Sequence, residues 1–344
     1  MRRPSTLLPP ARLYASQCQR RPYTNSPPKI PISASQAASQ MLNALQSKTS
    51  SRNQLLDGNQ LQKLALTLNH TTIHNQDITS SPPPDGTPIP PGHHLVYFTP
   101  LGAESELGPD GSDTKFNAPF PFSRRMWAGG KMTFPKVALR IGDQVEERTR
   151  LLSAVPKKSK SGQEMVLVEV EKEFSGPRGI GVVDRRSWIF RPEIDSSNDS
   201  AYTTSAGRLS RRPTTIVDHV KQGNQYPIRE LTWSPVGLFR FSALTFNSHK
   251  VHYDEGWSQG VEGHPGIVVH GPLNLINILD YWRHVHGRGK RLEGITYRAL
   301  SPLYAGDTYH IKTRDVANSD GGQVYEIAAE KNGTVCMKAE ITAA

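Results

Sequence analysis

Histidine is concentrated in one short part of the chain. Four of the 12 histidines, His249, His252, His264 and His270, lie within 22 residues of one another. An imidazole titrates near neutral pH, so it can take a proton from a substrate and return it, and it is also a common metal ligand. The segment from Phe241 to Leu273 is therefore the first candidate for an active site.

Residue type alone leaves three roles open for these histidines. They can perform acid/base catalysis, they can fill core positions with their hydrogen bonds satisfied, or His249 and His252 can bind zinc or iron together with Asp254. The spacing of these three residues matches no specific zinc pattern, and both cysteines are remote. We therefore expect acid/base chemistry and no metal.

The order of residues in this segment resembles the signature of MaoC-like type 2 enoyl-thioester hydratases. In that family an aromatic residue and small residues lead into Asp-X-Asn-Pro-X-His. Without gaps, Phe241 takes the aromatic position, Asn247 the Asp position, His249 the Asn position and His252 the His position. The reaction removes or adds water beside an acyl thioester, and it requires a group that both takes and returns a proton. The resemblance implies that His252 is this group.

A second motif of the family is a Gly eight residues before the Gly of a His-Gly-X-Leu helix start. It falls on Gly263 and on the residues from His270 to Leu273. The resemblance implies that the amide of Gly271, at the start of a helix, stabilises the thioester oxygen. It also implies substrate contacts for Tyr253, Gly266 and His270.

Asn247 is the point at which this sequence departs from the family pattern. An amide cannot act as a base, as an aspartate at this position could. Either His252 works with Asn247 as a water-positioning group, or His249 takes a second proton-handling role. The first interpretation is favoured, because Asn can still donate to and accept from the reacting oxygen.

A second candidate region lies between residues 120 and 130. Its sequence, Phe-Pro-Phe-Ser-Arg-Arg-Met-Trp-Ala-Gly-Gly, resembles the partner domain of the same family. Arg124 and Arg125 are predicted to bind phosphates of coenzyme A or of a phosphopantetheine arm, and Trp127 to pack against the substrate. Gly129 and Gly130 are predicted to let the substrate approach closely. The alternative is a surface strand with an ordinary turn.

The positive charge lies mainly at the N-terminus. The formal net charge is +10, but residues 1–56 contain eight Lys and Arg and no Asp or Glu. Without these eight charges +2 remains, so the rest of the chain indicates no nucleic-acid partner. A basic, Ser-rich, acid-free segment is typical of a mitochondrial transit peptide, and a basic arm that binds RNA or a membrane is the alternative.

The cysteines and the hydropathy pattern agree with a location in the mitochondrial matrix. Cys18 lies in the predicted leader and Cys336 near the C-terminus, so no internal disulfide is expected in the mature chain, which suits a reducing compartment. No stretch approaches the roughly 18 uninterrupted apolar residues of a membrane span. We therefore predict a mature protein with no membrane span.

Composition divides the chain into four parts. We predict a leader at 1–56, an N-terminal hot-dog-like domain at 57–191, a polar linker at 192–226 and a C-terminal catalytic domain at 227–344. The spacing of apolar residues between Ala34 and Leu68 predicts weak helices that cover a sheet. A Pro-rich loop at 80–92 enters the first half.

Both halves carry the alternation of antiparallel strands, at Met165–Phe174, Val324–Ala329 and Val335–Ile341. Ile267–Val285 is long enough for a buried helix. A Gly-Asp pair at 142–143 recurs at 306–307 before similar strands, which indicates two related halves. We predict an α+β fold in which an antiparallel sheet wraps around a central helix twice, and the resemblance names it a tandem, or double, hot dog.

The resemblance leads to one main functional prediction and two alternatives. The main prediction is a (3R)-3-hydroxyacyl-thioester dehydratase of mitochondrial fatty acid synthesis, reversible and without cofactor. One alternative is a mesaconyl-CoA or itaconyl-CoA hydratase, for which a cation in the pocket is expected. The other is a non-catalytic scaffold or binding protein.

The acyl carrier and the oligomeric state stay open. The thioester is formed with coenzyme A or with an acyl carrier protein. Four basic residues could attract an acidic carrier protein, and they are Arg283, Arg288, Lys290 and Arg291. The chain can be a monomer or a homodimer. It has neither a phosphate-binding loop ending in Lys-Ser/Thr nor a serine nucleophile elbow, which weakens nucleotide-binding and hydrolase interpretations.

Overall fold

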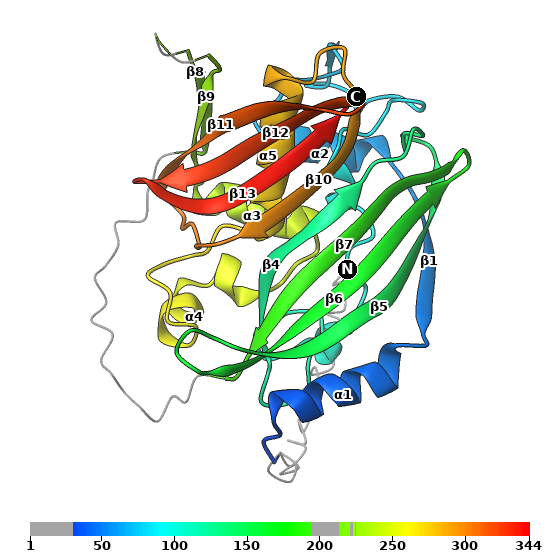
Figure 1. Ribbon diagram of the computed structural model, residues 1–344. Helices are drawn as coiled ribbons and strands as arrows, with labels where there is room; N and C mark the ends of the chain where they lie inside the picture. The colour runs from blue at the N-terminus through cyan, green and yellow to red at the C-terminus, as the bar shows by residue number, and fades with distance from the viewer. Residues whose placement is uncertain (1–29, 194–212, 221–222, 224) are drawn as a thin grey trace, which may run out of the picture. The chain divides into compact units, whose positions relative to one another are not determined.

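An antiparallel sheet of 11 strands forms the frame of the protein (Figure 1). The computed structural model describes residues 30–193, 213–220, 223 and 225–344. Strand order is β1-β5-β6-β7-β4-β10-β13-β12-β11-β9-β8, so the strands of each half lie together. The first half contributes β1 (Thr49–Leu55), β4 (Arg124–Thr133), β5 (Gln144–Lys158), β6 (Glu164–Gly176) and β7 (Gly179–Arg191). The second contributes β8 (Thr215–His219), β9 (Ile228–Thr232), β10 (Leu292–Ala299), β11 (Thr308–Ser319), β12 (Gly322–Lys331) and β13 (Thr334–Ala343).

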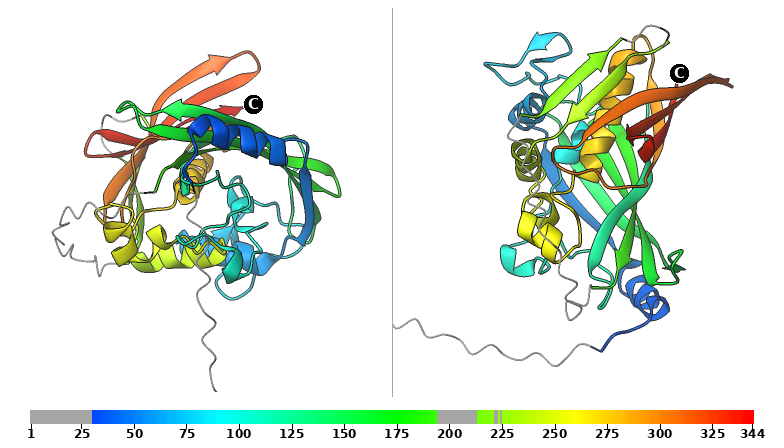
Figure 2. Two further views of the ribbon diagram at one scale, coloured as in Figure 1. Left: turned by 90° about the horizontal axis from the view of Figure 1, so that it is seen from below. Right: turned by 90° about the vertical axis from the view of Figure 1, so that its left-hand side faces the viewer.

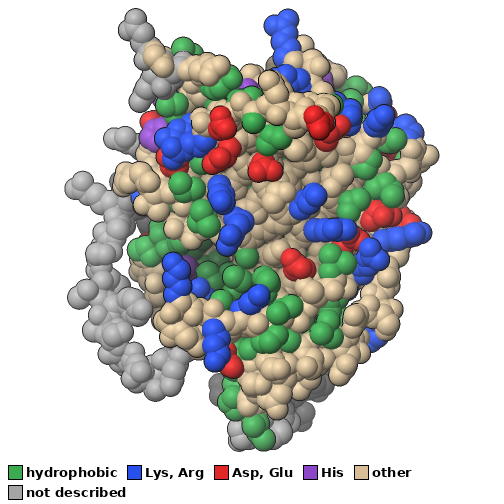
Figure 3. All heavy atoms as spheres, viewed as in Figure 1, with side chains coloured by type: hydrophobic (Ala, Val, Ile, Leu, Met, Phe, Trp, Pro, Cys, Tyr) green, Lys and Arg blue, Asp and Glu red, His purple; other side chains and the backbone are tan. Residues whose placement is uncertain are grey.

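The two faces of the sheet differ because side chains alternate along each strand. On β6, Val166, Val168 and Val170 are buried on one face. On the other face Glu171 pairs with Arg150 at 2.5 Å and with Arg185 at 2.7 Å. Figure 3 shows basic and acidic side chains interspersed on this side of the sheet, with more basic than acidic ones in view.

The second half of the sheet wraps around helix α5 (Gly271–Val285), as Figure 2 shows. The helix has His270 as its N-cap and a proline in its first turn, where the missing amide hydrogen costs nothing. Every residue from Leu273 to Trp282 is buried. A helix that is buried on all sides in this way is the centre of a core, as the apolar run in the sequence predicts.

The same turn occurs in both halves, which supports the predicted internal repeat. In the first, Gly142 has φ +87° and Asp143 Oδ2 accepts the amide of Arg140 at 2.7 Å. In the second, Gly306 has φ +84° and Asp307 Oδ2 accepts the amide of Tyr304 at 2.9 Å. Both glycines adopt the left-handed conformation that residues with a Cβ adopt only at a cost.

The repeat also shows what stands in place of a second central helix. Arg140 forms an isolated bridge with Pro88 and Tyr304 forms one with Val268, and the chain enters α5 three residues after Val268. Between Pro88 and β4 the chain forms only two short 3-10 helices, His93–Val96 and Glu104–Glu106. The expected long helix is therefore found in the second half alone, and the first half has room for a cavity.

The other helices are α1 (Ala34–Leu45), α2 (Gly58–Thr67), α3 (Pro235–Leu244) and α4 (Glu255–Gly260). Helix α3 shares the core of α5, and α1 packs on the buried face of β6. The remaining elements are β2 (Thr72–Ile73) and β3 (Gln76–Asp77) and the 3-10 helices Glu104–Glu106 and Lys250–His252. Among the described residues, no helix has the length and apolar character needed to cross a membrane.

The folded part of the chain begins earlier than the predicted leader boundary at residue 56. Helix α1, capped by Ser33, buries Ala37 and Met41 against the first half of the sheet, and β1 pairs with β5 along its whole length. The boundary was placed at residue 56 because no acidic residue precedes Asp57, but a lack of acidic residues does not prevent folding. Residues 1–29 and most of the predicted linker, 194–212, lie outside the described residues. Strand β8 falls within the predicted linker.

Strands β4 and β10 join the two halves of the sheet. Two glycines of β4 allow the neighbouring strands to approach it, Gly129 on the side of β10 and Gly130 on the side of β7. A Cβ on Gly129 would lie 2.4 Å from the carbonyl oxygen of Tyr297, and a Cβ on Gly130 would lie 2.2 Å from that of Arg185. The predicted role of these glycines in admitting substrate is thus corrected, because they admit neighbouring strands and do not line the cavity described below.

Candidate active site

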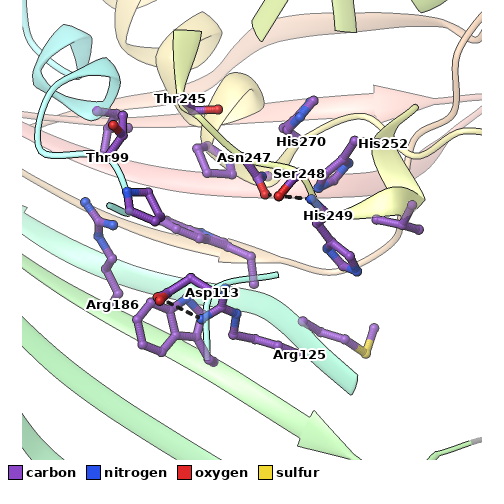
Figure 4. A pocket seen from close by; sticks show the side chains of 18 of the residues that line it. Thr99, Asp113, Arg125, Arg186, Thr245, Asn247, Ser248, His249, His252 and His270 are labelled. Atoms are coloured by element: carbon purple, nitrogen blue, oxygen red, sulfur yellow. Dashed lines mark hydrogen bonds and ion pairs between the residues drawn. The ribbon is translucent and has the colours of Figure 1, made fainter. Parts of the chain in front are cut away.

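A cavity of about 800 Å³ lies between the two halves of the chain. Its floor is formed by β4 and β7, and its opposite side by the segment after α3 and the start of α5 (Figure 4). Most of the predicted site residues line it, namely Arg124, Arg125, Trp127, Asn247, His249, His252, His270 and Gly271. Gly129, Gly130, Tyr253 and Gly266 do not.

His252 has a tautomer fixed by the backbone. Its Nδ1 lies 2.8 Å from the carbonyl oxygen of Val268, and only a protonated nitrogen can donate to a carbonyl. Nε2 then carries the lone pair and bonds no described residue. Burial, with a smaller effect of His249, lowers the pKa of His252 to about 3, so the ring is neutral at neutral pH. It is a proton acceptor in the wall of the cavity.

His270 supports the ring of His252 from behind. The two imidazoles stack with centroids 3.7 Å apart and an angle of 19°. His270 Nε2 is hydrogen bonded to the hydroxyl of Ser242 on α3 at 2.9 Å, and Phe241 contacts the ring edge-on. Burial and the neighbouring imidazoles hold the pKa of His270 well below its usual value. This ring therefore fixes the plane of His252 and is itself neutral.

Gly271 places the first amide of α5 at the cavity. Of the described residues, none bonds this amide, and the next residue, Pro272, has no amide hydrogen. A helix N-terminus carries unpaired donors and a partial positive charge, which favour a developing negative oxygen. A Cβ at this position would lie 3.1 Å from Trp127 Cγ, so glycine leaves room for both the indole and the helix start.

Asn247 and His249 lie in the turn that follows α3. The turn passes through Phe246, whose φ is +47°, and Asn247 Oδ1 accepts the amide of His249 at 3.1 Å. Burial, followed by the positive charge of Arg125, lowers the pKa of His249 to about 3. The ring meets His252 edge-on, with centroids 5.3 Å apart. Figure 4 shows both rings on the same side of the cavity.

Asp110 is a residue of the site that the sequence did not reveal. It lies in a turn of the first half, and its Oδ2 is 3.5 Å from His249 Nε2. The only local signal is the run Gly-Pro-Asp-Gly-Ser at 108–112, which is typical of a surface turn. Nothing in that run indicates that its aspartate is buried against a histidine of the other half.

The two adjacent arginines of β4 differ in their surroundings. Arg124 Nε bonds Glu262 Oε2 at 2.8 Å, so the charge of Arg124 is neutralised by an ion pair within the protein. Arg125 stacks on Trp188 at 5.2 Å and has Asp113 at 4.0 Å. Arg186 of β7 lies over Trp127 at 5.4 Å, and its Nε is held by a buried aspartate. Arg125 and Arg186 are thus rigid cations on the floor of the cavity.

A metal site is not formed by the residues considered from the sequence. Asp254 caps α4 by accepting the amide of Trp257 at 2.9 Å and does not join His249 and His252. In the described part of the chain one other group has suitable spacing for a metal, and it consists of His70, Asp280 and His284. Both oxygens of Asp280 accept from arginines, which makes this group an ion-pair network.

The comparisons with known proteins agree with this geometry. Residues 92–305 match the family model described as hydroxyacyl-thioester dehydratase type 2. The mesaconyl-C(4)-CoA hydratase of Chloroflexus aurantiacus is 30% identical over 227 residues, which cover 65% of this chain and 74% of the relative. The mitochondrial hydroxyacyl-thioester dehydratase type 2 of Schizosaccharomyces pombe is 26% identical over 244 residues, 67% and 80% of the two chains.

Solved structures share the fold. A MaoC-like dehydratase from Phytophthora capsici has a TM-score of 0.59 and 14% identity, over 89% of this chain and 98% of its own. HtdX of Mycobacterium tuberculosis has a TM-score of 0.53 and 13% identity, over 86% and 99%. The α+β double hot dog predicted from the sequence is confirmed.

Proposed function

The chain belongs to the hydroxyacyl-thioester dehydratase type 2 family, and we propose that it reversibly removes water from (3R)-3-hydroxyacyl thioesters. One observation carries the proposal. His252, whose Nε2 is left unprotonated by the bond of Nδ1 to Val268, lines the same cavity as Gly271, whose amide bonds none of the residues that the structure describes. This reaction needs a group that accepts a proton and a hydrogen-bond donor that stabilises the negative thioester oxygen.

In the proposed mechanism His252 carries the proton in both steps. Its Nε2 takes the proton from C2, and the electron pair of that bond moves toward the thioester oxygen. The C3–O bond then breaks, and the same proton leaves Nε2 for the departing hydroxide, which forms water. The imidazolium that exists in between lies in a buried site, where the negative enolate beside it offsets the cost of its charge.

The amide of Gly271 and the N-terminus of α5 stabilise the enolate oxygen. Removing one donor of this kind typically costs about 3 to 4 kcal/mol of transition-state stabilisation. Asn247 has a positioning role in this mechanism. Its carbonyl oxygen is used by the amide of His249, so its NH2 group is the part that can donate to the 3-hydroxyl.

The test is an activity assay with the purified chain and with His252→Ala. Formation of the conjugated enoyl thioester is followed by its absorbance, with 3-hydroxyacyl thioesters of several chain lengths on coenzyme A and on acyl carrier protein. The substitution is expected to lower kcat/KM at least about 100-fold. His310→Ala, in an exposed ion pair on β11, is the matched control. Wild-type turnover in the His252 variant would refute the mechanism, and inactivity of the unaltered chain would refute the function.

The cations on the cavity floor favour a second candidate, a hydratase of a small dicarboxylic coenzyme A ester. Arg125 and Arg186 hold guanidinium groups in the cavity opposite the histidines, where a neutral alkyl chain would gain nothing from them (Figure 4). A second carboxylate on the acyl group would pair with them. The relative from Chloroflexus aurantiacus that is named for mesaconyl-C(4)-CoA adds support.

A comparison of KM for two substrates separates the two candidate functions. Under the second candidate, Arg125→Met and Arg186→Met raise KM for mesaconyl-CoA about tenfold or more and leave KM for a neutral four-carbon enoyl ester nearly unchanged. Arg185→Met, whose side chain pairs with Glu171 outside the cavity, is the control. Turnover of the dicarboxylic ester alone would make this candidate the function. Equal effects of the arginine variants on both esters would exclude it.

We further propose a location in the mitochondrial matrix. The relatives of Schizosaccharomyces pombe and Saccharomyces cerevisiae are named mitochondrial, and the first 29 residues contain six basic and no acidic residues. Because Ser33 caps α1, we expect the targeting signal to end before it. Residues 1–32 fused to a fluorescent protein should enter the matrix, and a fusion that remains in the cytosol would contradict the proposal.

The basic cluster after α5 gives little support for a carrier-protein partner. Arg283 bonds Asp280, Lys290 bonds Tyr325, and Arg291 bonds Glu293. Of these cations, Arg283 and Arg291 are each paired with a carboxylate, and a charge neutralised in this way attracts a distant acidic partner less. Either carrier of the thioester is therefore compatible with the proposed function, and the assay above includes both.

A further inference from the structure

The carboxylate of Asp110 and the imidazole of His249 face each other across the boundary between the halves. Oδ2 lies 3.5 Å from Nε2, and the side chains are only 10% and 15% exposed. Within the described chain Nε2 has no hydrogen-bond partner. An ionised carboxylate can only accept, so this contact favours the tautomer of His249 that carries its proton on Nε2.

The backbone holds these two groups in place. The amide of Lys250 donates to the carbonyl of Asp110 at 2.8 Å, and the hydroxyl of Ser248 donates to the carbonyl of Gly111 at 2.7 Å. Gly111 has φ +78°, and a Cβ there would lie 2.1 Å from the carbonyl oxygen of Ser248. The turn at Asp110 is thus built against the segment that carries His249.

The carboxylate is also held within its own turn. Asp110 Oδ1 accepts the amide of Ser112 at 3.0 Å, and the Ser112 hydroxyl lies 2.8 Å from Oδ1 and 3.0 Å from Oδ2. In this orientation Oδ2 is the oxygen that faces His249. The second ring nitrogen of His249, Nδ1, bonds no residue that the structure describes, and the ring lines the cavity. His252 Nε2 is unprotonated on the neighbouring ring, 5.3 Å away between centroids.

We propose that Asp110 keeps the proton of His249 on Nε2, so that His249 Nδ1 and His252 Nε2 together accept the two hydrogens of the water that adds to C3. This inference rests on the proposed hydro-lyase function. A water that donates both hydrogens to fixed acceptors presents a lone pair to the substrate. Proton transfer still passes through His252. As the oxygen of the water bonds C3, His252 takes one proton from the water, and it then delivers that proton to C2.

The pair performs a task that Asn247 cannot perform alone. The carbonyl oxygen of Asn247 already accepts the amide of His249, and its NH2 group can only donate. A water between His252 and an amide donor would have only one acceptor. Asp110 is accordingly a positioning residue that acts through His249.

The first test replaces Asp110 by Asn. An amide can donate to Nε2 and allow the proton to move to Nδ1, so kcat for hydration is expected to fall at least about tenfold, with KM changed less than about threefold. Asp254→Asn is the matched control, since Asn is an equally good cap for α4 and the carboxylate of Asp254 bonds the amide of Trp257. Wild-type kcat in Asp110→Asn would overturn the inference.

A pair of His249 variants tests the role of each nitrogen. In His249→Asn the amide lies where Nδ1 was and can offer an oxygen to the water. In His249→Gln the amide lies where Nε2 was, so contact with Asp110 is kept and the acceptor is lost. His249→Asn is expected to be at least about fivefold more active than His249→Gln. The reverse order would contradict the inference.

A spectroscopic measurement separates this inference from the proposed function. In protein labelled with ¹⁵N-histidine, long-range proton–nitrogen spectra should show His249 protonated on Nε2 and unprotonated on Nδ1, with its signals identified by their loss in His249→Gln. In Asp110→Asn the two tautomers should be mixed. This measurement of the His249 tautomer needs no turnover, so it tests the inference even if the chain has no activity on the thioesters tested. An unchanged tautomer in Asp110→Asn would refute the pairing.

Discussion

The stacked imidazoles of His252 and His270 set the chemical character of the site. Burial keeps both rings neutral, and the backbone carbonyl of Val268 decides which nitrogen of His252 is free. A neutral stacked pair avoids the repulsion that two imidazolium ions would suffer at 3.7 Å. The site is therefore prepared to accept one proton at a time.

These buried histidines make stability depend on pH. Burial lowers the pKa of His93, His249 and His252 to about 3, whereas the unfolded chain titrates near 6.5. Between these values the unfolded state binds more protons, so stability is complete above about pH 6.5 and falls as the pH drops toward 3. The slope is at most about 1.4 kcal/mol per pH unit for each such histidine. Urea unfolding at pH 7.5, 6.0 and 5.0 measures it.

A single variant identifies the contribution of His252. His252→Asn should make the fall of stability between pH 6.5 and 5 less steep, because one proton fewer is taken up on unfolding. Gly260→Ala in α4, which changes no titratable group and where an added Cβ meets no described atom within 4 Å, should leave the slope unchanged. An identical slope in unaltered protein and His252→Asn would show that His252 is protonated in the folded state.

At the scale of elements, the sequence predicted helices and strands with a clear apolar period, and it did not predict a strand that depends on contacts with another strand. The strands β6, β12 and β13 and helix α5 were all predicted, because the side-chain pattern of each is imposed by its own burial. Helices between Ala34 and Leu68 were predicted as well, but β1 between them was missed. Its polar sequence, Thr-Ser-Ser-Arg-Asn-Gln-Leu, becomes a strand only through pairing with β5.

Truncation tests whether α1 and β1 belong to the fold. A chain that begins at residue 31 should have the stability of the full chain. A chain that begins at residue 57 loses the cover that Met41 gives to Val166 and Val168 and leaves β5 as an open edge. It should lose about 3 kcal/mol or more of its free energy of unfolding, or aggregate. Equal melting temperatures of the two truncated chains would show that the folded domain begins at residue 57, as the sequence predicted.

At the scale of the whole described molecule, the proposed active site is divided between the halves. Arg125, which lines the cavity, and Asp110, which contacts His249, come from the first half, and His249, His252 and Gly271 come from the second. The sequence predicted four of these five, because each lies in a motif with a recognisable order. Asp110 could not be predicted, because its importance depends on a contact between turns that are remote in sequence and adjacent only after the sheet has formed.

This division makes the joint between β4 and β10 important for catalysis, which Gly130→Ala tests. The added Cβ would meet the carbonyl oxygen of Arg185 at 2.2 Å and the hydroxyl of Tyr297 at 2.7 Å, so β4 must shift. Overpacking of this kind costs about 1 to 3 kcal/mol of stability. Because Arg125 and Trp127 lie on the same strand, kcat/KM should also fall, by up to about 100-fold for a displacement near 1 Å.

The control for this substitution is Gly260→Ala in α4, where an added Cβ has no described atom within 4 Å and helix propensity favours alanine. It should leave both stability and activity close to those of the unaltered chain. If Gly130→Ala lowers stability and leaves kcat/KM unchanged, the first half acts only as a support for the second. If both fall together, the rigid joint between the halves is what aligns the carboxylate and cations of one with the histidines of the other.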